Sequence, residues 1–222
     1  MAAAKRFQLK PDIPADLLAK YRKAGLVAVD TELQGLTLGR DNVCLTQFCD
    51  KAGNVALVPI KAPKTPPNVK ALLTDPKVVK IFHYAVTDVA FLRNSLDIVV
   101  TPFECTKVMS KLVRTYTDSH GLRYLVAELA GVELDKDSQM TDWSRSDLSA
   151  KQLVYAANDV LHLIKVYEAL QKMLEHRGKL PSGITAKELN KRTQAVLPTV
   201  VELIINGYGD RDGGWETSIF SH

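Results

Sequence analysis

"LVAVDTE", residues 26–32, is an apolar run that ends in two carboxylates separated by a single residue. The aliphatic run predicts a buried strand, and successive side chains of a strand point to opposite faces. Asp30 and Glu32 would then share one face, while Thr31 points to the other. Two like charges side by side need a cation between them, a shared proton or open water. The alternative is that the strand ends at Val29 and that both acids simply stand in solvent.

Turn residues and apolar runs around this strand predict an α/β layered domain. Residues 16–25 read as a short amphipathic helix that ends in glycine. Residues 43–50 and 55–60 predict two strands that are at least partly antiparallel to their neighbours. Residues 69–85 predict a helix and a fourth buried strand, and residues 102–106 a short fifth strand. Further helices are predicted over residues 86–96, 107–116, 121–131, 149–178 and about 184–207.

The bulk composition favours one globular domain, residues 1–222. The 222 residues are 46% hydrophobic and can supply a core. Residues 1–25 would be a lead-in with its helix, and residues 178–222 a C-terminal helix and tail. No apolar run approaches the roughly 18 residues that span a bilayer, and the N-terminus has no apolar signal segment, so we expect a cytoplasmic protein with no membrane partner. The formal charge of +4 is mild, so a small anionic ligand fits at least as well as long nucleic acid.

Cysteines and histidines do not form metal-binding patterns. The three cysteines are an odd number without CxxC spacing, which argues against a disulfide framework and against a zinc knuckle. The five histidines show no HExxH or paired ligand spacing, so a histidine-based metal site is not expected.

Two later acids are candidate partners for the first pair. Asp88 lies in the first turn of the helix predicted after the fourth strand, where it could equally be a capping acid. Tyr155 and Asp159 are four residues apart on a helix and share one face. Asp159 has mainly apolar sequence neighbours, and a carboxylate in such surroundings needs a partner. Four acids from a strand end and two helices could form the oxygen-rich site that Mg²⁺ or Mn²⁺ prefers.

Three sequence blocks carry a resemblance to a known family. "VDTE" (29–32), "HYAVTD" (83–88) and "YAAND" (155–159) resemble the blocks of the DEDD 3′–5′ exonucleases, in the subclass with a tyrosine four residues before the last aspartate. Residues 121–160 resemble ribonuclease D. The stretches 31–48 and 105–122, with a "GW…IF.H" ending, are more similar to the nano-RNase C (NrnC) group.

The resemblance implies an RNase H-like (DnaQ-like) exonuclease fold, with a mixed five-to-six-stranded sheet flanked by helices. It also implies hydrolysis with two divalent cations, Mg²⁺ or Mn²⁺, held by Asp30, Glu32, Asp88 and Asp159. Tyr155 would orient the attacking water, because a tyrosine with an ordinary pKa of roughly 10 is a poor free base at neutral pH. The implied activity is 3′–5′ hydrolysis of very short RNAs, chiefly 5′-phosphorylated diribonucleotides such as pGpG, by a homo-oligomer that forms an octameric ring.

Substrate contacts are expected from two places. Leu36 would wedge near the bases, as a similarly placed leucine does in the family, unless it is an ordinary loop or core leucine. The block that follows residue 110 offers groups for the 5′ phosphate, or else a solvated helix end with a salt bridge to Asp118. His83 could lie by the catalytic strand or be a core histidine, and Trp143 could stack on a base or pack. The expected substrate-binding residues are Leu36, Thr31, His83, Lys111, Arg114, Tyr116 and His120, with Thr117 as a further phosphate candidate.

The last residues and two rival functions complete the expectations. The closing segment 215–222 is expected to dock near an active site of its own chain or a neighbour, with His222 as a ligand contact. One rival is a general 3′–5′ exonuclease acting on longer RNA or DNA. The other is a catalytically idle domain that only binds nucleic acid, and such a module should have lost at least one metal ligand.

Overall fold

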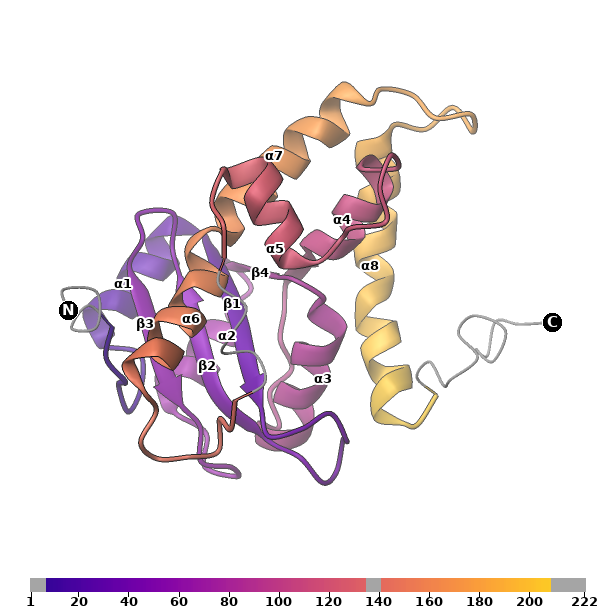
Figure 1. The fold of residues 1–222 in the computed structure, drawn as a ribbon. Coiled ribbons are helices and arrows are strands. Elements are labelled where there is room, and N and C mark those ends of the chain that lie inside the picture. The colour runs from indigo at the N-terminus through magenta and orange to yellow at the C-terminus, as the bar shows by residue number, and fades with distance from the viewer. Residues whose placement is uncertain (1–6, 135–140, 209–222) are drawn as a thin grey trace.

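A mixed five-stranded sheet forms the centre of the protein in the computed structural model, which describes residues 7–134 and 141–208 (Figure 1). The strand order is β3-β2-β1-β4-β5. This agrees with the predicted mixed sheet and the predicted strand positions. The strands are β1 (Leu26–Leu33), β2 (Val43–Cys49), β3 (Val55–Pro59), β4 (Val79–Phe82) and β5 (Phe103–Cys105).

The directions of the strands bring the acidic blocks to one edge of the sheet. β1 is antiparallel to β2 and parallel to β4, and β4 is parallel to β5. The carboxyl ends of β1, β4 and β5 therefore lie at the same edge. Asp30 and Glu32 lie near the end of β1 at that edge, and the helix that carries Asp88 begins there, soon after β4.

Helices cover both faces of the sheet, so the fold has three layers (Figure 1). α6 and α7 pack on one face, where Ala28, Val160 and Ile164 share a buried cluster. α1, α2, α3 and α8 contribute to the larger core on the other face, which includes Val27 and Val29 of β1. The helices are α1 (Ala15–Ala24), α2 (Pro67–Leu73), α3 (Ala85–Leu96), α4 (Thr106–Val113), α5 (Leu122–Leu125), α6 (Ala150–Leu161), α7 (Leu163–His176) and α8 (Ala186–Ile205).

The single helix predicted over residues 149–178 is wrong, because the chain breaks at His162 into α6 and α7. α6 begins with a capping box, in which Ser149 and Gln152 satisfy each other's backbone N–H groups. It packs on β1, β2 and β3, whereas α7 packs on α4 and β4. The two halves thus differ in their main neighbours, although both contact β1.

Two other predicted helices differ from the structure in their ends or in their type. α4 ends at Val113, so the residues predicted to extend it to 116 lie outside it. The helix predicted over 121–131 is α5 followed by one π-helical turn, Val126–Ala130. Gly131 ends that turn with a positive φ of 70°, a conformation that glycine adopts readily.

Side-chain and backbone groups of the chain itself occupy part of each sheet edge. At β5, the Cys105 N–H donates to Gln194 Oε1 (2.8 Å), and Gln194 Nε2 donates to the Cys105 carbonyl (3.1 Å). Gln194 belongs to α8, so this helix is tied directly to the sheet. At β3, the Lys10 N–H donates to the Leu57 carbonyl (2.9 Å).

Two smaller observations complete the fold. The cysteines, Cys44, Cys49 and Cys105, carry free thiols. Among the residues that the structure describes, none of the helices combines the length and the apolar character needed to cross a bilayer.

Candidate active site

Three of the predicted metal ligands meet at the carboxyl edge of the sheet. Asp30 and Glu32 come from β1 and Asp159 from α6, and one ligand atom of each lies within 4.8 Å of the others. Glu32 is buried, and the other two are partly buried. Three carboxylate groups at such short range provide the hard oxygen ligands that Mg²⁺ or Mn²⁺ prefers.

The charges of this cluster oppose one another. Burial raises the pKa of Asp30 to about 7. Burial, followed by the charges of Asp30, Asp159 and Asp88, raises the pKa of Glu32 to about 10. Burial and the charge of Asp30 also hold the pKa of Asp159 well above its usual range. A divalent cation would remove this repulsion, so the residues present fit such an ion.

Asp88 is not one of these three converging acids, but it contacts β1 through Thr31. Its carboxylate accepts a hydrogen bond from the Thr31 hydroxyl (2.6 Å). Thr31 thus points to the face away from Asp159, as the strand alternation predicts. Burial and the charge of Asp30 raise the pKa of Asp88 well above its ordinary value, so its carboxylate lies within electrostatic range of the cluster. The capping alternative for Asp88 also holds in part, since Asp88 lies in the first turn of α3 and its carboxylate accepts a hydrogen bond from its own backbone N–H.

Tyr155 lies beside Asp159 on α6, one turn before it. Its hydroxyl is hydrogen-bonded to the Asp159 carboxylate, and its pKa is raised by burial and then by the charges of Asp159 and Glu32. The tyrosine is therefore a neutral phenol at physiological pH. Its ring packs against Trp143 with 6.1 Å between ring centroids. Trp143 is 5% exposed and belongs to a buried cluster, in agreement with a packing role.

Gln47 is a contact of the site that the sequence did not reveal. It lies on β2, is fully buried, and donates from Nε2 to Glu32 Oε1 (3.3 Å). A partner in this position restricts the orientation of the Glu32 carboxylate, as groups behind a metal ligand commonly do. The available signal was a glutamine within the predicted strand over residues 43–50, at a position that pairs with Asp30 of β1.

Leu36 lies on the loop that follows β1 and is 79% exposed, more than any other large hydrophobic residue that the structure describes. The alternative of a core leucine is therefore wrong. The exposure is compatible with the predicted wedge, which stays a prediction.

His83 follows β4 and is half-buried. Its Nδ1 lies 3.0 Å from the Thr106 hydroxyl, which is also hydrogen-bonded to the Phe82 carbonyl. Burial and then the charge of Lys107 lower the pKa of His83 to about 3. Lys107 also lies 3.9 Å above the ring of the exposed Tyr84. Sequence reasoning missed Lys107 as a positive group near His83. Its place at the start of the helix after β5 could have indicated this, because that helix begins at the same edge of the sheet.

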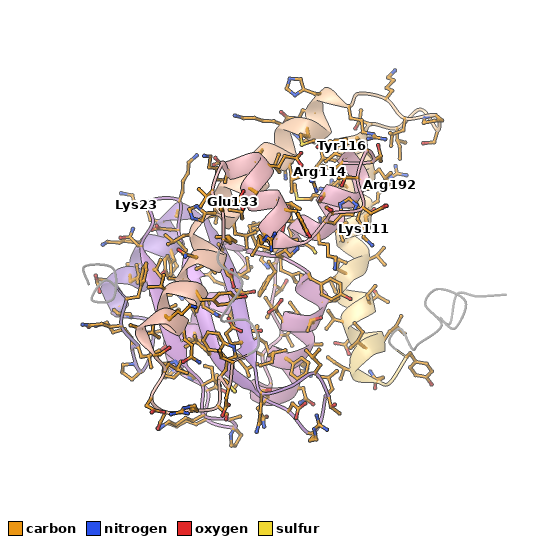
Figure 2. All side chains as sticks on the ribbon, viewed as in Figure 1. Lys23, Lys111, Arg114, Tyr116, Glu133 and Arg192 are labelled. Carbon is orange, nitrogen blue, oxygen red and sulfur yellow. The ribbon has the colours of Figure 1, made fainter. Side chains whose placement is uncertain are left out.

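The predicted phosphate-binding residues gather around α4 and the loop after it, in the upper part of Figure 2. Arg114 is only 1% exposed, and its Nη2 forms a 2.5 Å ion pair with Glu128. The partner of Arg114 is thus Glu128, so the alternative of a solvated helix end with a salt bridge to Asp118 is wrong for this residue. Tyr116 is 65% exposed, and its hydroxyl also donates to Glu128.

Lys111 and His120 are more accessible to an anion than Arg114. Lys111 is exposed, whereas His120 is half-buried and its Nδ1 lies 2.8 Å from the Ser110 hydroxyl. Burial, followed by the charges of Arg114 and Lys111, lowers the pKa of His120. The closing segment 215–222, with His222, lies outside the described residues.

Comparison with known families gives one match over most of the chain. The model of the 3′–5′ exonuclease family matches residues 7–175. A ribonuclease D from Granulibacter bethesdensis is 35% identical over 167 residues, which are 75% of this chain and 42% of the relative. A ribonuclease D from Bartonella henselae is 33% identical over 158 residues, 71% of this chain and 39% of the relative. The chain thus spans less than half the length of these relatives.

Solved structures match nearly the whole chain. Brucella melitensis NrnC is 36% identical with a TM-score of 0.83, and the match covers 96% of this chain and 97% of that one. The same protein bound to pGG is 34% identical with a TM-score of 0.81, over 96% and 95% of the two chains. With bound Mg²⁺ it is 33% identical with a TM-score of 0.80, over 97% and 96%.

The family match includes β1, α3 and α6, the three elements that carry the predicted ligands. The acids and the tyrosine of all three sequence blocks are present. The chain therefore belongs to the 3′–5′ exonuclease family and is a homologue of ribonuclease D and NrnC.

Proposed function

We propose that this chain is a metal-dependent 3′–5′ exoribonuclease that hydrolyses very short RNAs, chiefly 5′-phosphorylated diribonucleotides such as pGpG, to mononucleotides. The observation that carries the proposal is the convergence of Asp30, Glu32 and Asp159 beside Tyr155. A module that only binds nucleic acid has no use for three mutually repelling acids, of which Glu32 is buried and the other two are partly buried.

The roles of the side chains follow from their chemistry. Asp30, Glu32, Asp159 and Asp88 would hold two divalent cations, directly or through water. The cations, Mg²⁺ or Mn²⁺, would activate water and stabilise the charge that develops on the leaving 3′ oxygen. Tyr155, as a neutral phenol, would orient the attacking water by hydrogen bonding rather than remove its proton.

The preference for short substrates is supported by how the matches extend over the chain. NrnC matches 96% of this chain at 36% identity, and one NrnC structure holds pGG. The exposed Leu36 would contact the bases. Thr31, between the two strand acids, acts through its hydrogen bond to Asp88.

The 5′ phosphate would meet the positive groups of α4. Lys111 is exposed there, and Lys107 lies close enough to His83 and His120 to lower the pKa of each. Arg114 and Tyr116 would support this surface through Glu128 rather than contact the phosphate themselves. His83 keeps a neutral ring that is hydrogen-bonded through Nδ1 to Thr106.

The proposal includes assembly into a homo-oligomer. The resemblance to NrnC implies that this oligomer is an octameric ring. A ring would limit the entry of long or structured RNA. Light scattering coupled to size-exclusion chromatography measures the number of subunits directly.

A general exonuclease acting on longer RNA is the second candidate, because the curated relatives carry the name ribonuclease D. Turnover of pGpG is compared with that of 5′-phosphorylated five- and ten-nucleotide RNAs, with Mg²⁺ or Mn²⁺ and with chelator. We expect turnover of pGpG to be fastest and to require metal, and Asp159→Asn to abolish it. Equal rates at all three lengths would favour the second candidate.

A further inference from the structure

The loop between β1 and β2, residues 34–42, holds Leu36 in solvent while both of its flanks are anchored. Leu33 and Leu38 pack against the large core, and Leu36 between them is 79% exposed. The Gln34 N–H donates to the Asn42 carbonyl (2.9 Å) and closes the base of the loop. An exposed leucine contributes little to folding, since it buries little apolar surface. The contacts within the loop therefore fix an apolar side chain that the fold itself does not use.

One buried carboxylate organises these contacts. Asp41 is 6% exposed, and its Oδ2 accepts a hydrogen bond from the Thr37 N–H (2.9 Å). In return the Asp41 N–H donates to the Thr37 carbonyl (2.9 Å), so the two residues are joined in both directions. Arg40 adds two 2.8 Å bonds to the same carboxylate from an exposed side chain. Thr37 is the residue next to Leu36, so the Asp41 carboxylate holds the backbone beside the leucine.

Gly35 lies on the other side of Leu36 and makes room for this carboxylate. A Cβ atom at Gly35 would lie 2.3 Å from Asp41 Oδ2 and 2.8 Å from Asp41 Cγ. Such distances do not occur in real structures, so any side chain at position 35 would displace Asp41. Both neighbours of Leu36 in the chain are thus adapted to the same carboxylate.

We propose that Asp41 is a positioning residue that holds Leu36 ready for the substrate bases, and that it acts on substrate affinity through Leu36 alone. The inference rests on the proposed function, which assigns the bases to Leu36. A leucine that is already held in place loses less conformational freedom on binding than one on a mobile loop. Asp41 should therefore lower the KM for substrates with two bases and leave kcat nearly unchanged.

The first test measures KM and kcat for wild type, Leu36→Ala, Asp41→Ala and the double variant. The substrates are pGpG, a 5′-phosphorylated five-nucleotide RNA and the p-nitrophenyl ester of thymidine 5′-monophosphate, which has only one base. We expect Asp41→Ala to raise the KM for pGpG by about three- to tenfold, the range for immobilising one side chain. The KM for the single-base ester should not change. The double variant should match Leu36→Ala, because Asp41 acts through that residue.

The second test measures the loop without turnover. Hydrogen–deuterium exchange over residues 34–42 should become faster in Asp41→Ala, because the Thr37 N–H loses its acceptor. Asp41→Asn keeps an oxygen for that N–H. Its exchange rate over the loop and its KM for pGpG should therefore lie between those of wild type and Asp41→Ala. Gly35→Ala should raise exchange and KM as Asp41→Ala does, because its methyl group displaces the Asp41 carboxylate. It provides the same test if Asp41→Ala folds poorly.

A matched control lies at the other end of the sheet. Asp75 also accepts a backbone N–H, from Lys77 (3.0 Å), and an arginine, Arg22 (2.9 Å), in the loop before β4. Asp75→Ala removes the same kind of contacts there and should leave the KM for pGpG unchanged.

The outcomes separate this inference from the proposed function. An unchanged KM in both Asp41→Ala and Gly35→Ala overturns the inference even if wild type prefers pGpG. The inference is also overturned if Asp41→Ala and Leu36→Ala raise the KM for pGpG additively. The same holds if Asp41→Ala raises the KM for the single-base ester as much as the KM for pGpG. If wild type shows no preference for pGpG but both single variants raise KM without additivity, the proposed function fails and the inference stands.

Discussion

The acidic cluster should make the metal-free protein less stable as the pH rises, and a divalent cation should reverse this effect. Ligand atoms of Asp30, Glu32 and Asp159 lie within 4.8 Å of one another. Two full charges at that distance repel by about 3 kcal/mol at an effective dielectric constant of roughly 20. Three such pairs would approach about 10 kcal/mol, comparable with the whole free energy of unfolding of a typical domain. The metal-free protein must therefore retain protons on this site, as the raised pKa values indicate.

Asp30 determines the direction in which the free energy of unfolding changes with pH. Its pKa is about 7 in the folded protein against an ordinary value of 3.8, so the folded state binds more protons than the unfolded state between these values. The free energy of unfolding of the metal-free protein should therefore fall as the pH rises from about 4 to 7 through this group. Thermal unfolding with chelator at pH 5, 6, 7 and 8 measures the trend.

Adding Mn²⁺ at about 100 times its dissociation constant should contribute about 2.7 kcal/mol. For a chain of this length the Tm should rise by roughly 5–10 °C. Binding at pH 7 should also release about one proton or more, because cation ligands must be ionised. Calorimetry in two buffers with different ionisation enthalpies counts these protons.

Asp159→Asn separates this explanation from general salt effects. It removes one repelling charge, so the metal-free variant should unfold at a higher temperature than wild type at pH 8 and should lose the cation-induced rise. Asp97→Asn is the control, since Asp97 is exposed at a positive φ of 52°, which asparagine tolerates. No rise in Tm and no proton release in wild type, or a full rise in Asp159→Asn, would refute a cation site at this cluster.

Three further variants test separate contacts. Tyr155→Phe should lower kcat by roughly 100-fold with little change in KM, the order for losing one hydrogen bond aimed at the reacting groups, and steady-state kinetics on pGpG measures it. Gln47→Leu should weaken Mn²⁺ binding by about 10-fold, because it removes a hydrogen bond to a metal-site carboxylate; calorimetric titration measures this. Arg114→Ala should cost about 1–3 kcal/mol in denaturant unfolding, since it leaves the Ser110 hydroxyl and the Ser119 carbonyl without their donor. Arg145→Ala, which removes an exposed ion pair, should cost less than about 1 kcal/mol and is its control.

The sequence predicted the parts of the site that follow from local geometry. Strand alternation correctly separated Thr31 from Asp30 and Glu32, and the four-residue helical spacing correctly put Tyr155 beside Asp159. These rules depend only on the backbone repeat, so no knowledge of distant contacts was needed.

Features that depend on long-range packing were not predictable in the same way. The break at His162 has no proline or glycine to signal it. The apolar pattern continues through it, because both helices bury residues in the same cluster on one face of the sheet. Arg114 looks in sequence like a solvated cation near a helix end, yet Ser110, Ser119 and Glu128 enclose its guanidinium. A local sequence pattern cannot reveal such partners.

The occupied sheet edges bear on how copies of this protein can meet. An open edge strand invites strand addition from another molecule. Here the backbone groups of Cys105 are already satisfied by the Gln194 amide, and β5 is only three residues long. At the opposite edge of the sheet, the Lys10 N–H donates a hydrogen bond to the Leu57 carbonyl of β3. Association between subunits should therefore use side-chain surfaces of helices and loops, which can be specific and reversible, rather than an extension of the sheet from one molecule to the next.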